Sequence, residues 1–143
     1  MIGETHVYGF NNEDRLSKYF FETYQATKTT QRYSLFDFES ESVLIELKSR
    51  RCFHNSYFDT MIGCNKIEEG CRQLRNKTKE HVFFYFDFND GLYYYELKID
   101  DVLRRDSFNG RPYYFIQVEH LCRTEVPHLL KLPPCPVKHI RGM

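Results

Sequence analysis

Two aromatic runs joined by a turn constrain the fold of this chain more than any other feature. Residues 81–88 read HVFFYFDF, residues 92–99 read LYYYELKI, and Asn89, Asp90 and Gly91 stand between them. Aromatic and β-branched residues favour strands, and a short Asn/Asp/Gly segment between two such runs is typical of a tight turn. The pattern predicts an antiparallel hairpin over residues 81–99, and so a domain built on a β-sheet.

The remaining segments predict a mixed α/β domain. Residues 11–25 and 63–76 have the spacing of amphipathic helices, whereas residues 32–38 and 43–50 read as strands joined by a short polar turn. A second hairpin is expected around Asn109 and Gly110, with its second strand in RPYYFIQVEHL. The order predicts a mixed central sheet flanked by helices. We expect residues 1–125 to form one domain and residues 126–143, which hold four of the five prolines, to form a C-terminal extension.

Composition bears on location more than on partners. Twenty basic residues balance twenty acidic ones, so net charge indicates no partner. The N-terminal stretch lacks the basic-then-apolar pattern of a signal peptide, and no apolar run approaches the ~18 residues needed to cross a bilayer. The five cysteines are odd in number and never spaced CxxC, which favours free thiols in a reducing compartment. We expect an intracellular protein of the cytoplasm or nucleus, neither secreted nor in a membrane.

The hairpin of residues 32–50 sets two carboxylates opposite each other. If it turns between Glu41 and Ser42, paired positions sum to 83, and Asp37 lies across from Glu46 with Cβ atoms roughly 4.5–5.5 Å apart. Phe36 and Phe38 then face the core beside Ile45. Alternation along the second strand predicts two faces: Val43, Ile45 and Leu47 toward the core, and Leu44, Glu46, Lys48 and Arg50 toward water.

Opposed carboxylates repel, and a divalent cation removes that cost. Mg²⁺ is held by one or two carboxylates together with waters and substrate phosphates, which Asp37 and Glu46 suit. Lys48, two residues along the same face, is placed to act on a water or a phosphate oxygen. The alternative is a solvated Glu46–Lys48 pair, worth ~0–1 kcal/mol.

The first helix adds a third carboxylate. At about 100° per residue, Glu13 falls within the apolar stripe of Leu16 and Phe20, whereas Glu22 falls outside it. We therefore expect Glu13, and not Glu22, to approach Asp37. A simple interaction of Glu13 with the helix dipole remains the alternative.

The acid on one strand followed by Glu46-Leu47-Lys48 on the next resembles the PD-(D/E)XK nuclease superfamily, and most closely its small Holliday-junction resolvases. The likeness covers roughly residues 10–90 and implies a restriction-endonuclease-like α-β-β-β-α-β core with extra C-terminal strands. It also implies a DNA endonuclease with Mg²⁺, or Mn²⁺ as a substitute. Asp37, Glu46 and Lys48 match the catalytic positions, and Glu13 joins the two acids as a metal ligand. Phe36 stands where the family motif has Pro.

Further expectations follow from this resemblance. Junction resolvases act as dimers, so a homodimer is one assembly that the resemblance allows for this chain. The segment YFDTMIGCNK (57–66) is also similar to segments of uncharacterised proteins of large DNA viruses, which adds the virion as a location and other viral proteins as partners. The competing function is an inactive nuclease-fold module for binding or structure, such as a viral particle component.

Basic residues after the candidate strand are the expected DNA contacts. We predict this role for Arg50, Arg51, Lys66, Arg72 and Arg75. A solvated helix face is the alternative for those in residues 63–76, and Lys66 alone reads as a surface lysine.

Three other groups of residues carry weaker functional signals. His and Cys residues gather near the C-terminus, but their spacing matches no zinc motif; they are His120, Cys122, His128, Cys135 and His139. Cys52 and His54 lack an orienting third group for nucleophilic catalysis. Tyr94 belongs to sheet packing, or it stacks a base.

Overall fold

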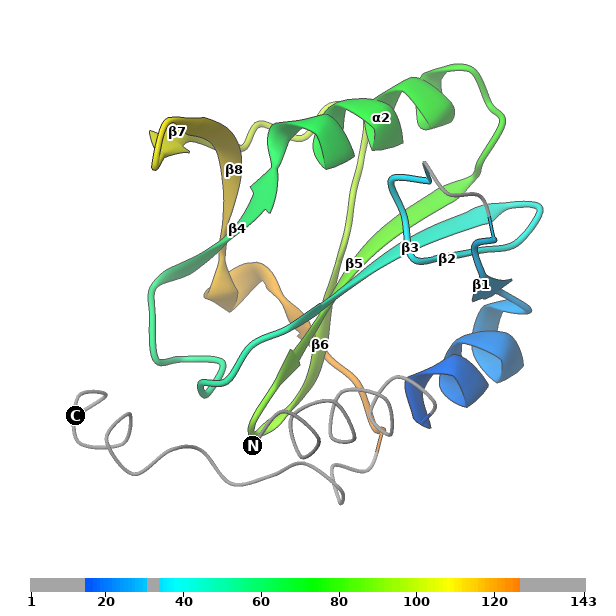
Figure 1. The fold of residues 1–143 in the computed structure, drawn as a ribbon, viewed down its shortest axis with the longest axis horizontal. Helices are drawn as coiled ribbons and strands as arrows, with labels where there is room; N and C mark the ends of the chain where they lie inside the picture. The colour runs from blue at the N-terminus through cyan, green and yellow to red at the C-terminus, as the bar shows by residue number, and fades with distance from the viewer. Residues whose placement is uncertain (1–14, 31–33, 127–143) are drawn as a thin grey trace.

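The fold is organised around a six-stranded sheet with strand order β1-β2-β3-β5-β6-β9 (Figure 1). The computed structural model describes residues 15–30 and 34–126. Neighbouring strands are antiparallel except β3 and β5, which are parallel. The strands are β1 (Thr27–Lys28), β2 (Phe38–Glu39), β3 (Val43–Ser49), β5 (His81–Phe88), β6 (Gly91–Glu96) and β9 (Cys122–Arg123).

The aromatic hairpin is present as predicted. β5 and β6 pair from Phe83↔Glu96 to Phe88↔Gly91, which leaves Asn89 and Asp90 in the turn. β6 ends at Glu96 rather than at residue 99. Every residue of β5 from Val82 onward is buried, because both faces of this central strand are covered.

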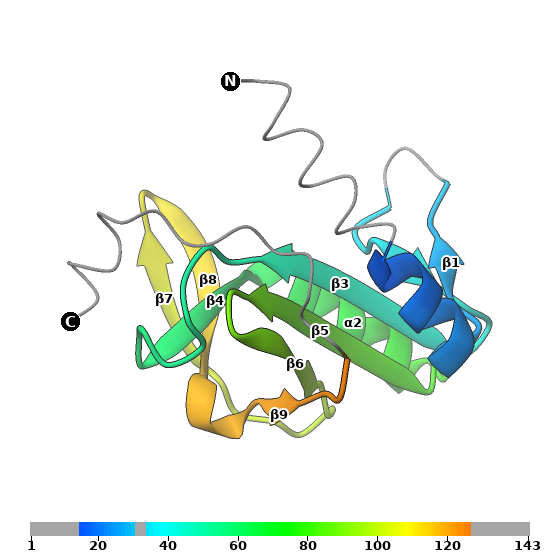
Figure 2. The ribbon, with the colours of Figure 1, turned by 90° about the horizontal axis from the view of Figure 1, so that it is seen from below.

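Two helices cover the two faces of the sheet. α2 (Cys64–Arg75) connects the parallel strands and packs Ile67 against a cluster that includes Leu44 and Phe84. The helix through residues 15–24 packs Leu16 and Phe20 against the opposite face, as its apolar stripe predicts. Figures 1 and 2 show the sheet between α2 and this first helix. The mixed sheet flanked by helices is therefore confirmed.

The prediction that β3 shows one face to water is wrong. Its first four residues, Val43 to Glu46, are all buried. The Leu44–Glu46 face lies under α2, and the Val43–Ile45 face lies under the first helix. A strand with a parallel neighbour and a helix on each side is buried on both faces.

Among the described residues of the strand predicted over 32–38, only Phe38 lies in a strand, as the first residue of β2. Its register is the predicted one, with Phe38↔Ile45 and Glu39↔Leu44. Residues 35–37 bend before the strand begins. As a result Phe36 joins the cluster under α2 while Phe38 joins the one under the first helix, so the expectation that both lie beside Ile45 is wrong.

A second sheet of three strands flanks the first. Its order is β4-β8-β7, with β4 at Asp59–Gly63, β7 at Arg104–Phe108 and β8 at Arg111–Gln117. The predicted hairpin at Asn109-Gly110 joins β7 to β8, and both turn residues have positive φ, 53° and 77°. A 3₁₀ turn, η1 (Val118–His120), leads to β9.

Some expectations fall outside this description. Residues 127–143, nearly all of the expected Pro-rich extension, lie outside the described residues, as does Glu13. Within residues 15–30 and 34–126, no helix is long and apolar enough to cross a bilayer.

Candidate functional site

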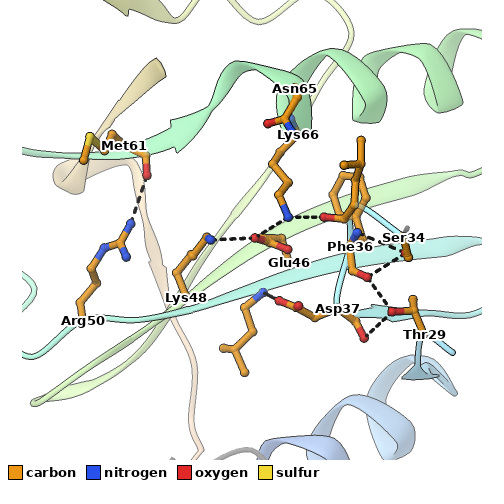
Figure 3. A network of polar contacts seen from close by, with 12 residues as sticks. Thr29, Ser34, Phe36, Asp37, Glu46, Lys48, Arg50, Met61, Asn65 and Lys66 are labelled. Carbon is orange, nitrogen blue, oxygen red and sulfur yellow. Dashed lines mark hydrogen bonds and ion pairs between the residues drawn. The ribbon is translucent and has the colours of Figure 1, made fainter. Parts of the chain in front are cut away.

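Asp37 is held against β3 beside Glu46. It directly precedes the β2–β3 ladder, where its backbone N–H donates to the Ile45 carbonyl at 3.0 Å. Its side-chain Oδ2 accepts the backbone N–H of Leu47 at 2.8 Å (Figure 3). The backbone N–H of Thr29 donates to the Asp37 carbonyl at 2.9 Å. Two hydrogen bonds thus fix the backbone of Asp37 and one orients its carboxylate, although the residue is exposed.

Glu46 is a buried carboxylate between two lysines. Its side chain is 2% exposed, and its Oε2 lies 3.1 Å from Nζ of Lys48 and 3.0 Å from Nζ of Lys66. Figure 3 shows the two lysines reaching it from β3 and from α2. Its other oxygen, Oε1, is buried and accepts no hydrogen bond from the residues that the structure describes. Burying an oxygen without a hydrogen bond costs free energy, even where the charge of its carboxylate is partly offset by neighbouring lysines.

The surroundings of Glu46 act on its proton affinity in opposite directions. Burial is the largest effect and raises the pKa of this carboxyl, and the charge of Asp37 raises it further. Lys48 and Lys66 oppose both, through their charges and through the hydrogen bond from Lys66. The pKa of Glu46 remains raised, so burial and the charge of Asp37 together outweigh the two ammonium groups.

Lys66 is more than the surface lysine that the sequence suggested. It lies in the first turn of α2, beside the buried Ile67, and its side chain turns in toward the sheet. Besides the ion pair with Glu46, its Nζ donates to the backbone carbonyl of Leu35. Nothing local in the sequence predicts this contact, because residues 35 and 46 reach it only through the sheet.

Lys48 shares the face of Glu46, as alternation along the strand predicts. The contact at 3.1 Å establishes this, and its side chain remains 38% exposed. Lys48 therefore contacts the buried carboxylate and also remains open to solvent.

The five predicted DNA contacts are placed differently from one another. Arg50 braces the two sheets, donating to the Met61 carbonyl at 3.1 Å, and burial lowers the pKa of its guanidinium. Arg51 is exposed. Arg72 is exposed and forms a two-point ion pair with Glu69 at 2.8 and 2.6 Å.

The α2 residues do not share one face. Arg75 is exposed in the last turn of α2. At 100° per residue, it lies about 180° and Arg72 about 240° around the helix from Lys66. Lys66 alone of these three turns toward Glu46, and DNA contact by Arg72 and Arg75 stays a prediction.

The residues present fit a divalent cation in part. Within the described ranges, no group of three or more His, Cys, Asp and Glu side chains could hold a metal ion. Asp37 and the unpartnered Oε1 of Glu46 supply the one or two carboxylates that Mg²⁺ ordinarily uses, the rest being waters and phosphates. Glu13 lies outside the described residues, so its approach stays a prediction; Glu22 is exposed.

The structure also locates His54, Tyr94 and part of the C-terminal His/Cys group. His54 has the orienting group that the sequence did not show: its Nδ1 lies 2.6 Å from Oδ2 of Asp90, in the β5–β6 turn. Tyr94 stacks on Tyr85 with ring centroids 5.3 Å apart, which supports the packing reading. His120 and Cys122 are exposed, whereas the remaining members of the C-terminal His/Cys group lie outside the described residues.

A groove of about 820 Å³ lies apart from these residues, beside the β2–β3 turn and the loop after α2. Its lining includes Ser42, Lys77 and Lys79 and none of the predicted site residues.

Comparison with models of known protein families, with curated proteins and with solved structures found no match to this chain.

Proposed function

We propose that this protein is a metal-dependent nuclease that hydrolyses DNA phosphodiester bonds at Asp37, Glu46 and Lys48. The observation that carries the proposal is Glu46, a carboxylate buried on a sheet strand with one oxygen lacking a described partner. A second carboxylate is held beside it, and a partly exposed lysine lies 3.1 Å away. Folding alone gains nothing from a buried carboxylate that lacks a hydrogen bond to one oxygen and lies beside a second acid.

The topology supports a restriction-endonuclease-like core. The first helix is followed by β1, β2 and β3 in antiparallel order, and then by α2 and the parallel strand β5. Apart from β4, which lies between β3 and α2, this order agrees with the α-β-β-β-α-β core that the resemblance to the PD-(D/E)XK superfamily implies, with the acid before β2 and the Glu-x-Lys on β3. β4 and the β7–β8 hairpin are additions to it.

Each residue has a distinct part in this proposal. Asp37 and Glu46 would hold Mg²⁺ or Mn²⁺, which when bound supplies a Lewis acid and lowers the pKa of water. Lys48 orients the attacking water or holds a phosphate oxygen, since its amine is partly open to solvent. Lys66 is a positioning residue that favours the ionised form of Glu46, the form a cation needs.

One observation favours the alternative, an inactive module for binding or structure. Lys48 and Lys66 both contact Oε2 of Glu46, so much of the buried negative charge is already offset without a cation. Such a cluster suits a nuclease fold that binds DNA or other proteins without cutting.

A cleavage assay separates the two. The protein is incubated with branched, single-stranded and linear duplex DNA in Mg²⁺, Mn²⁺ or EDTA. We expect metal-dependent cutting that Asp37→Asn and Glu46→Gln abolish while DNA binding persists. The matched control is Glu119→Gln, at an exposed carboxylate on η1, which should cut like the wild type. Binding of DNA without cutting in any metal would establish the alternative.

A further inference from the structure

The loop between β3 and β4 exposes three aromatic side chains. Phe53, Tyr57 and Phe58 are 39%, 66% and 67% exposed. Within the loop, the backbone N–H of Ser56 donates to the Phe53 carbonyl at 3.0 Å, which closes a turn. Three exposed aromatic residues within six positions of one loop indicate a binding surface, because apolar area left in water is unfavourable.

The loop is fixed in place at both ends. The backbone N–H of His54 donates to Oδ1 of Asp90 at 2.9 Å, next to the side-chain contact between the same residues. At the other end, the backbone N–H of Val118 donates to the Phe58 carbonyl at 3.0 Å. A backbone held by the β5–β6 turn and by η1 presents its rings in a preformed arrangement, which lowers the cost of binding.

The charge around the rings is complementary to nucleic acid. Residues 48–58 contain Lys48, Arg50 and Arg51 and no acidic residue. The two acids next to the loop are already paired, Asp59 with Arg104 at 3.0 Å and Asp90 with His54 at 2.6 Å. They also contain no aliphatic side chain, so the apolar surface of the loop is made of rings. Rings that directly follow basic residues suit a strand of unpaired bases better than an aliphatic partner surface, because every nucleotide has a base to stack and a phosphate to neutralise.

The position of the loop ties it to the proposed site. Phe53 follows Lys48 by five residues, a reach of at most roughly 17 Å of extended chain. Figure 1 shows the loop leaving the end of β3 at the edge of the molecule. At about 3.4 Å per stacked nucleotide, a strand held at Lys48 passes the first ring within about five nucleotides.

We propose that Phe53, Tyr57 and Phe58 form a stacking platform for unpaired bases, so that the preferred substrate is DNA with a single-stranded segment beside the scissile bond. This assignment of substrate rests on the proposed nuclease function. Arg51 neutralises phosphate between the platform and Lys48. Paired DNA cannot use the platform, because its bases are already stacked on one another.

The absence of tryptophan from the chain gives a direct reporter. Phe58→Trp places a single tryptophan on the platform, and its emission is followed during titration with oligo-dT in EDTA. We expect saturable quenching, at least tenfold weaker binding of blunt duplex, and no quenching in the control Phe21→Trp. Phe21 is 55% exposed on the first helix, which lies on the opposite side of the molecule from the loop (Figures 1 and 2). Equal quenching in both variants, or none in Phe58→Trp, overturns the platform.

Affinity measurements complete the test. Tyr57→Ala and Phe58→Ala should each weaken oligo-dT binding about five- to a hundredfold, the range for one lost stack, without changing the salt dependence. Arg51→Ala should instead flatten the salt dependence by about one unit. A blue shift of Phe58→Trp emission with anionic phosphatidylserine vesicles but not with oligo-dT, or self-association through the loop, contradicts the assignment.

These readouts need no metal, so they separate the two proposals. Stacking without cleavage of any DNA removes the nuclease and leaves the platform. Cleavage of paired and unpaired DNA at equal rates, with no effect of Tyr57→Ala or Phe58→Ala, removes the platform and leaves the nuclease.

Discussion

Replacing Lys66 with methionine tests whether α2 stabilises the buried carboxylate. Methionine keeps the apolar stem but removes the ion pair to Glu46 at 3.0 Å and the hydrogen bond to Leu35. Removing one partner of a buried pair typically costs about 3–5 kcal/mol. Because Lys48 still contacts the carboxylate at 3.1 Å, we expect the free energy of unfolding to fall by about 3 kcal/mol, the low end of that range.

The assay is equilibrium unfolding in urea at pH 7 with EDTA, followed by circular dichroism. The control is Lys98→Met, which removes a pair of similar length, 3.1 Å to Glu96, from a lysine that is 58% exposed; its cost should stay below about 1 kcal/mol. The double variant Glu46→Gln with Lys66→Met should recover most of the loss, because the buried group is then neutral.

The reasoning is refuted if Lys66→Met costs no more than Lys98→Met, or if its cost is unchanged in the Glu46→Gln background. Either result would mean that Lys66 and Glu46 are not coupled in the folded protein.

The remaining predictions use the same unfolding measurement. The raised pKa of Glu46 means that the folded state binds the proton of this carboxyl more tightly than the unfolded chain does. The free energy of unfolding should therefore fall as pH rises above about 4.5, the ordinary pKa, and through the raised pKa of the folded state. Glu46→Gln should remove this component of the pH profile. Gly70→Ala should lower the free energy of unfolding by about 1 kcal/mol, because the new Cβ would lie 2.9 Å from Cδ2 of Leu97. The overpacking cost of about 1–3 kcal/mol exceeds the gain of about 1 kcal/mol in helix propensity. Arg50→Met should cost about 2 kcal/mol through the lost hydrogen bond to the Met61 carbonyl, and an unchanged free energy of unfolding would contradict a stabilising role for this contact.

Turn residues and hydrophobic periodicity correctly predicted the elements whose structure depends on one short stretch of chain. The Asn89–Gly91 segment predicted the β5–β6 turn, and the polar turn before Val43 predicted the register that places Asp37 next to Glu46. The 3.6-residue spacing predicted α2 to within a residue at each end. In these cases the turn or the periodicity lies within one short stretch of chain.

Long-range packing explains what the sequence did not predict. The burial of Glu46 depends on α2 covering β3, and alternation along one strand cannot show which faces other elements will cover. β4 was missed because its pairing partner, β8, lies about fifty residues further along, as Asp59↔Gln117 shows. The contact of Lys66 with Glu46 likewise joins a helix to a strand through the fold alone.

The most direct test of the central claim is calorimetric titration of Mn²⁺ into the wild type and three variants. The account predicts a saturable site in the wild type that Asp37→Asn and Glu46→Gln each weaken at least tenfold. Lys48→Met should bind the metal within a few-fold of the wild type, yet cut DNA ~10²–10⁴-fold more slowly, because Lys48 acts on the water or phosphate. Absence of binding in the wild type, or equal affinity in all four proteins, would contradict the assignment of Asp37 and Glu46 as metal ligands.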